Sequence, residues 1–383
     1  MKHVRIYTYC FLLLTALGCK KPYAPSIVAD PPSYLVVEGV IVAGADSTII
    51  KLSRTVNLAK KTTNSPVVHA TLSVESDGNT SYPLTEVKTG VYASPALNLD
   101  NSKKYRLRIK TPDNHVYLSD FTAVSVTPPI DSIGFKILDK GLQIYINAHD
   151  AQNKTRYYRW NYEETWIFHS TYYSGFMSNG ITIIPRPLNQ QIYQCFASDT
   201  STSILLGSTA RLTQDVVYQN PVTFISPTSE KIGIKYSILL RQYALTSEAF
   251  TFWTNLKKNT EQLGSIFDAQ PSQINGNIHD VNNPTEAVVG YISTSTVQTK
   301  RIFIDDTELP RNWRPDYPVS CHIDSFYYSD PKFGKNQVVD LVSSSDIPIS
   351  SFGVRTIEGY LAADRPCVDC TIRGKTQPPS FWK

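Results

Sequence analysis

Short runs of alternating apolar and polar residues, separated by turn-forming residues, constrain the fold of this chain most. In Thr71–Glu75 and Tyr105–Ile109 every second side chain is apolar. Successive side chains of a β-strand point to opposite faces, so this alternation indicates strands with one buried face. The turn sequences Asp77-Gly78-Asn79 and Pro112-Asp113-Asn114 follow such runs and predict hairpins. The chain is therefore predicted to be mainly β.

Residues 34–127 contain several of these short runs and are predicted to form an N-terminal domain. Their spacing favours an antiparallel β-sandwich of the Ig-like or transthyretin-like kind. Gly39 interrupts the first run, where we expect a β-bulge. The domain should end at Thr127-Pro128-Pro129, because paired prolines cannot lie in a central strand.

Residues 131–383 are predicted to form a larger β-rich domain with one main α-helix, at about 247–263. Apolar residues recur there at helical spacing, as in Ala249, Phe252 and Leu256. Thr246 or Ser247 is suited to cap the start of this helix. The domain should finish in a C-terminal tail that is held by a disulfide.

Residues 1–18 have the pattern of a secretory signal peptide. Lys2 and Arg5 form a basic start, and the apolar stretch around Phe11–Leu14 follows. This stretch is too short to cross a bilayer, which needs about 20 apolar residues.

The end of this signal, Ala16-Leu17-Gly18-Cys19, resembles a bacterial lipobox. We expect lipidation of Cys19 and a lipid anchor in the membrane, since stable anchoring takes more than one acyl chain. The alternative is an ordinary secreted protein that is cut nearby and carries a stray cysteine. Residues 19–33 contain four prolines and are predicted to be an extended tether.

The remaining cysteines of the exported chain suggest two disulfides. They are Cys195, Cys321, Cys367 and Cys370. Three pairings are possible. Alternatively, the Cys367-Val368-Asp369-Cys370 segment is a redox pair or half of a zinc site, but no second Cys-x-x-Cys accompanies it. We therefore favour disulfides and predict no metal site and no cofactor.

The run at 158–168 places its aromatic rings on one face of the predicted strand. A row of rings such as Trp160, Tyr162 and Trp166 can stack on a sugar, or it can form the core of a sheet protein. Arg159 and Asn161 point to the opposite face of the strand, toward solvent or a partner.

Charge and motifs exclude several classes of function. The net charge of +4 over 383 residues is too small for a dedicated nucleic-acid binder, so no nucleic-acid partner is predicted. No nucleophile elbow, His-Glu-x-x-His helix or phosphate-binding glycine loop is present in the sequence. A non-enzymatic protein is the simplest interpretation, although a hydrolase built from scattered acids stays open until the fold is known.

Several stretches in order resemble the Bacteroidota outer-membrane lipoproteins grouped as domain of unknown function 4249. These stretches are Leu35–Gly39, Thr246–Phe267 with Asp268–Pro271, Asn275–Ile278, Val289–Tyr291, Cys367–Cys370, Arg373-Gly374 and Phe381-Trp382. The resemblance implies an outer-membrane lipoprotein whose gene neighbours often encode TonB-dependent receptors. It supplies no catalytic residues.

These observations lead to three functional hypotheses. The first is an accessory, substrate-capturing subunit of a TonB-dependent receptor barrel, anchored by lipid in the outer membrane. The second is a free-standing glycan- or peptide-binding lipoprotein, and the third is a hydrolase. The residues after Cys19 are basic, Lys20 and Lys21, and the first acid is Asp30. Whether the anchored protein faces the periplasm or the cell surface therefore stays undecided.

Overall fold

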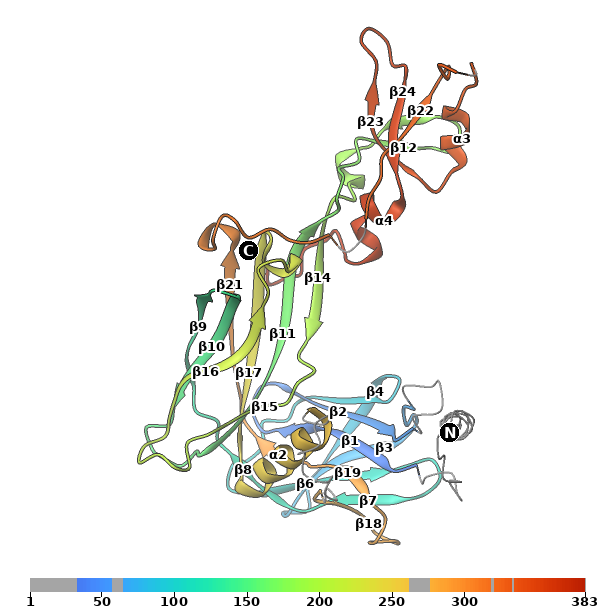
Figure 1. Cartoon of the computed structure of the whole chain (residues 1–383). Coiled ribbons are helices and arrows are strands. Elements are labelled where there is room, and N and C mark those ends of the chain that lie inside the picture. The colour runs from blue at the N-terminus through green and yellow to red at the C-terminus, as the bar shows by residue number, and fades with distance from the viewer. Residues whose placement is uncertain (1–32, 57–64, 262–275, 318–319, 333, 383) are drawn as a thin grey trace, which may run out of the picture.

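The computed structural model describes residues 33–56, 65–261, 276–317, 320–332 and 334–382. The predicted signal peptide, Cys19 and nearly all of the tether lie outside these residues. The chain is 47% strand and 11% helix, which confirms the mainly β prediction. Figure 1 shows a barrel at one end, two packed sheets in the middle and a small unit with β12, β22, β23 and β24 at the other end.

Seven strands of the first part and one late strand, β20, close into an eight-stranded barrel. In order around the ring they are β6 (Lys104–Lys110), β3 (Thr71–Ser76), β4 (Ser81–Lys88), β5 (Val91–Ala96), β2 (Ser47–Arg54), β1 (Leu35–Val42), β20 (Thr294–Ser295) and β8 (Thr122–Ser125), which pairs with β6 again. Both predicted hairpins are present: β3 turns into β4, and β6 turns into β7 (Val116–Ser119).

The Ig-like or transthyretin-like sandwich predicted for residues 34–127 is not confirmed, because these strands form a closed ring. The inward-facing side chains, such as Leu35, Tyr92 and Ile109, fill one core inside the barrel. A barrel and a sandwich both bury one face of each strand, so alternation alone does not distinguish them.

Strands from much later in the chain complete this sheet. β18 (Ile278–Asp280) pairs with β7, and β19 (Val288–Gly290) and β20 run parallel to β1. The predicted domain boundary at 127–131 stays a prediction, but residues 278–295, which we assigned to the second domain, lie in the barrel sheet. The sheet is therefore mixed rather than antiparallel.

The bulge expected at Gly39 is absent, because the register between β1 and β2 runs through Gly39 without a shift. Gly39 has φ +152°, and a Cβ there would lie 2.5 Å from the backbone oxygen of Ile49. The glycine is required because the neighbouring strand approaches closely and the backbone conformation is one that L-residues avoid.

Two facing sheets form the middle of the molecule. One contains β16 (Val216–Ile225), β10 (Gly141–His149) and β9 (Ile130–Leu138). The other contains β14 (Gln194–Thr200), β11 (Tyr157–His169), β17 (Lys235–Leu245) and β21 (Val297–Asp305), with β15 (Leu205–Ser208) beside β11. Ile144 from the first sheet and Trp160 and Leu240 from the second belong to one core, so the two sheets pack face to face.

The main helix, α2 (Ser247–Glu261), follows β17 as predicted. The Thr246 hydroxyl accepts a hydrogen bond from the backbone N–H of Ala249 at 3.2 Å and caps the helix. The last predicted positions, 262 and 263, lie outside the described residues. Among those described, no helix is long and apolar enough to cross a membrane.

A small C-terminal unit projects from the far end of β11 (Figure 1). It contains the hairpin β12 (Phe176–Ser178) and β13 (Ile183–Pro185), the helix α3 (Val338–Ser343), and a sheet of β22 (Asp324–Tyr327), β24 (Gly359–Ala363) and β23 (Ile347–Phe352). The short helix α4 (Arg365–Val368) follows.

The two predicted disulfides are present, and the structure decides their pairing. Cys321 bonds to Cys367 inside the C-terminal unit, and Cys370 bonds to Cys195 on β14. After Cys370 the tail runs along the middle sheet, where the Trp382 ring contacts Phe196 and Phe303 edge to face. The tail is therefore linked by disulfide, as predicted, and the Cys-x-x-Cys segment divides its two thiols between two bridges.

We expect the double variant Cys195→Ser/Cys370→Ser to lose about 2–5 kcal/mol of stability, since the bridge closes a loop spanning 175 positions. Urea unfolding followed by tryptophan fluorescence measures the change. The matched variant Cys321→Ser/Cys367→Ser should leave the transition of the middle sheets nearly unchanged, because this bridge lies within the C-terminal unit. Equal losses in both variants would contradict the assignment.

A buried polar network joins the barrel to the middle sheets. The Thr127 hydroxyl lies 2.9 Å from the hydroxyl of Ser295 and accepts a hydrogen bond from the Ala244 N–H at 3.0 Å. The Gln242 side chain accepts from the Trp160 indole N–H and donates to the Pro128 carbonyl, both at 2.8 Å. These groups are almost fully buried, so each bond that is lost leaves a partner unsatisfied.

Thr127→Val should therefore lower the free energy of unfolding by about 1–3 kcal/mol, since it leaves the Ala244 N–H and the Ser295 hydroxyl without this partner. Thr85→Val is the control, because the Thr85 hydroxyl is exposed and makes a 3.4 Å contact. Chemical denaturation of both variants tests the difference. A Thr127→Val protein as stable as Thr85→Val would show that the network contributes nothing.

Candidate functional site

The aromatic face of β11 lies in the core. Trp160 is 1% exposed and Trp166 is 8% exposed, and Tyr162 packs against the same core. A buried ring presents no face to a sugar. Burial thus argues against a stacking role for Trp160 and Trp166, whose rings belong to the core between the two middle sheets. Tyr162 is partly buried and also lines the cleft described next, so its stacking role stays a prediction.

The opposite face of β11 lines a cleft of about 980 Å³ between the barrel and the middle sheet. β1 and β2 supply one wall, and β11, β17 and α2 supply the other. A cleft of this volume is in the range that holds a small organic ligand. Sequence analysis placed Arg159 and Asn161 on this face, but it did not predict what covers them.

Arg159 is the central charged residue of this cleft. Its guanidinium carbon lies 3.9 Å from the centre of the Trp253 ring and 5.8 Å from the Tyr243 ring. Its Nη1 atom is buried and has no hydrogen-bond partner among the described residues. Burial lowers the pKa of Arg159, but a guanidinium stays charged at neutral pH.

The free energy of the two ring contacts is smaller than the cost of removing the Arg159 charge from water. Cation–π contacts of a desolvated arginine contribute about 2 kcal/mol. Removing a cation from water costs several times more unless it is paired and hydrogen-bonded. The geometry thus leaves Arg159 oriented by two rings but short of an acceptor.

A second polar atom beside Arg159 also lacks a partner within the described part of the chain. The side-chain oxygen of Asn161, two residues along β11, is buried and unpaired. In contrast, the next residue on this face, Glu163, forms an ion pair with Arg241 of β17 at 2.9 Å. Among the residues that line the cleft, Arg159 and Asn161 are therefore the ones with a buried, unpaired side-chain atom.

Helix α2 positions the aromatic wall of the cleft. The Phe252 ring lies 5.5 Å from the Tyr291 ring, which follows β19 of the barrel sheet. At the other end of α2, the Lys257 ammonium donates to the Ile204 carbonyl, and Glu261 accepts from the Ile204 N–H. The helix is held at both ends, so Trp253 is fixed over the guanidinium.

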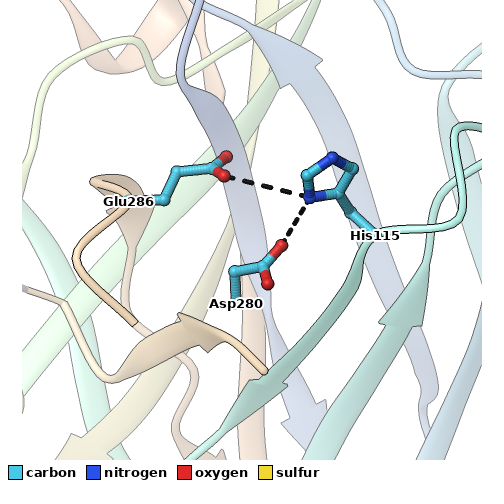
Figure 2. A group of neighbouring side chains, drawn as sticks. All are labelled: His115, Asp280 and Glu286. Atoms are coloured by element: carbon cyan, nitrogen blue, oxygen red, sulfur yellow. Dashed lines mark hydrogen bonds and ion pairs between the residues drawn. The ribbon is translucent and has the colours of Figure 1, made fainter. Parts of the chain in front are cut away.

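A cluster of ionisable side chains lies on the barrel away from this cleft (Figure 2). The His115 Nδ1 atom is 2.7 Å from the Asp280 carboxylate and 3.9 Å from that of Glu286. Asp280 is fully buried, and its other oxygen accepts two backbone N–H groups, from Asn282 and Asn283. The Tyr117 hydroxyl donates to Glu286 at 2.8 Å.

This cluster has donor atoms that suit a divalent transition metal: an imidazole nitrogen and two carboxylate oxygens, all within 4.8 Å of one another. The hydrogen bond to Asp280 raises the pKa of His115, however. A proton on His115 competes with a metal for the same nitrogen. The geometry is therefore best described as an ion pair that ties β18 to β7. Sequence analysis missed it because His115 and Asp280 lie 165 positions apart.

The sequence profile of one family, described as domain of unknown function (DUF4249), matches residues 20–301. The chain belongs to this family. The match covers the barrel, the cleft and the His115 cluster, and it ends before the cysteines of the C-terminal unit. The resemblance noted in the sequence is thereby confirmed for the DUF4249 family.

No curated protein matches this DUF4249 chain. Among solved structures, the adhesin InvE of Yersinia pseudotuberculosis is similar at 15% identity and a TM-score of 0.14. The aligned part is 55% of this chain, and the chain spans about half, 55%, of the length of that adhesin. A TM-score this low carries no conclusion about fold or function.

Two of the stretches that resemble the family, Asn275–Ile278 and Val289–Tyr291, contain a glycine where two backbones meet. An added Cβ at Gly276 would lie 1.7 Å from the carbonyl oxygen of Gly290, so the two backbones touch there. Next to this contact, the Asn277 side chain exchanges two hydrogen bonds with the Ile292 backbone, at 2.8 and 2.9 Å. These residues hold the segment that leads into β20.

The raised pKa of His115 predicts a pH dependence of stability. The ion pair with Asp280 contributes fully below the unfolded-state pKa of about 6.5, and the contribution is lost as the pH rises through the folded-state value. His115→Gln should therefore lower the melting temperature more at about pH 5.5 than at about pH 8.5. The difference should correspond to about 1 kcal/mol or less, because His115 is half exposed.

Melting curves at the two pH values measure this effect, with the exposed His322→Gln as the control. A His115→Gln protein that loses the same stability at both pH values would show that the histidine is not charged in its pair.

Proposed function

We propose that this DUF4249 protein is a lipid-anchored, non-enzymatic outer-membrane protein that captures a small ligand for a TonB-dependent receptor. The observation that carries this proposal is the cleft between the barrel and the middle sheet, with Arg159 and Asn161 unpaired at its wall. A pre-formed cleft with a few unsatisfied polar groups is the usual form of a small-molecule site.

The N-terminal sequence supports the anchored part of the proposal. The lipobox-like Ala16-Leu17-Gly18-Cys19 provides the lipidation site. An extended proline-rich tether gains about 3.1 Å per residue, so residues 20–33 would allow the barrel to lie roughly 40 Å from the lipid surface. This reach leaves room for the cleft to approach a membrane-embedded partner.

The receptor partnership rests on the family resemblance and on the shape of the molecule. The barrel and the C-terminal unit lie at different ends of the middle sheets (Figure 1), and the cleft is lined by β1 and β2 of the barrel, so ligand capture and docking can use separate surfaces. A stable complex should bury at least ~1,000 Å². The second hypothesis, a glycan binder that uses the aromatic strand, is less well supported because its two tryptophans, Trp160 and Trp166, are buried.

The test is affinity purification of a C-terminally tagged protein from gently solubilised outer membranes, with the Cys19→Ser variant as the matched control. We expect the unmodified protein to sediment with membranes and to recover a TonB-dependent barrel at near-equal abundance. The Cys19→Ser protein should appear in the soluble fraction. A Cys19→Ser protein that stays in the membrane would refute the anchor, and recovery of the lipoprotein alone would refute the partnership.

A further inference from the structure

The unpaired groups in the cleft define the chemistry of the ligand that it can hold. The Arg159 guanidinium is planar and carries its donors in a fixed fork, which matches the two oxygens of a carboxylate. Its Nη1 atom already lies out of water without an acceptor within the described residues, while Arg159 as a whole is partly exposed and lines the cleft. A ligand that brings an anion therefore gains a hydrogen bond at a place where the desolvation cost of the protein group has already been met.

The walls of the cleft are mixed, and part of the surface is apolar. Val36 and Val40 of β1, Leu256 of α2 and Val297 of β21 line the same cleft. The two rings that flank the guanidinium, Trp253 and Tyr243, add flat apolar surface next to the charge. A small inorganic anion would leave most of this surface wet, whereas an organic anion with an apolar body would cover it.

The other cations that line the cleft are Arg241 and Lys51, and Lys51 is exposed, whereas the Arg159 Nη1 atom is buried. Arg241 is paired with Glu163. Glu38 is the acid that acts on Arg159, but it is exposed, no hydrogen bond joins the two, and Lys51 lies directly opposite Glu38 in the β1–β2 pair. Glu261 lies at the edge of the cleft and is bonded to Ile204 and Lys257.

We propose that the cleft binds a small organic carboxylate with an apolar body, whose carboxylate is received by Arg159 and Asn161 between the Trp253 and Tyr243 rings. The Asn161 amide supplies a further polar contact, with its amide group free to turn its nitrogen toward the anion. This inference names the class of ligand that the proposed capture protein would bind. It rests on the proposed function only for the purpose of binding, not for the binding itself.

Isothermal titration calorimetry on the full mature chain carrying Cys19→Ser tests the proposal without detergent. The probes are 4-phenylbutyrate and decanoate as carboxylates, 4-phenylbutanamide as the neutral match, and inorganic phosphate as an anion without an apolar body. We expect saturable binding of at least one carboxylate, and binding of the amide and of phosphate at least about tenfold weaker, since a charge-assisted bond is lost or the apolar contact is missing.

Variants locate the site. Arg159→Gln should weaken carboxylate binding by about tenfold or more, and Arg159→Lys should restore only part of it, because the fork is lost but the charge is kept. Glu38→Gln should bind at least as tightly as the parent. Arg106→Gln should bind like the parent, because Arg106 pairs with Glu75 on the barrel outside the cleft. Circular dichroism confirms that each variant is folded.

Several results would overturn the proposal. These are no saturable binding of either carboxylate, equal affinity for the amide, equal affinity for inorganic phosphate, or full affinity in folded Arg159→Gln. The first of these would mean that the two rings alone hold Arg159. The assay needs no membrane or receptor, so a carboxylate site found here stands even if no receptor is recovered, and a recovered receptor stands even if this ligand class is wrong.

Discussion

Closure of the barrel depends on β20, a strand of two residues that pairs with β1 on one side and with β8 on the other. Thr294 is 1% exposed and Ser295 is fully buried. Their polar side chains are satisfied by Thr122 and Thr127, so a buried seam of hydroxyl groups replaces the apolar contacts of an ordinary strand. Without this strand, β8 and the last part of β1, beyond the residues that pair with β19, would be open edges, which natural sheets avoid.

The same seam determines where the cleft lies. The chain leaves the barrel at Thr127, builds most of the middle sheets, and returns to the barrel through β18 to β20 before it enters β21. Thr127 and Gln242 bond the two bodies together at this crossing. The outer face of β1 is thereby held opposite the polar face of β11, and Arg159 is enclosed between them.

The alternating pattern of β11 predicts which side chains share a face, but not what packs against each face. Alternation correctly places Tyr158, Trp160 and Phe168 on one face, and the structure buries that face in the core. The same alternation places Arg159 and Asn161 on the other face. No local pattern reveals that helix α2 covers this face, because Trp253 and Arg159 are 94 positions apart and meet only through the tertiary fold. The same holds for His115 and Asp280.

The sequence by itself determined the strand content, both hairpins, the capped helix α2, the existence of two disulfides and the membership of the DUF4249 family. These features depend on residues that are close in the chain or on composition, so local physics is sufficient. Only the tertiary structure decided that the first domain closes as a barrel, which cysteines pair, and that one side-chain atom each of Arg159 and Asn161 is buried without a hydrogen-bond partner. Those outcomes depend on contacts between segments separated by 46 positions, as in Cys321 and Cys367, up to 253 positions, as in Ile41 and Thr294, for which alternation and spacing carry no information.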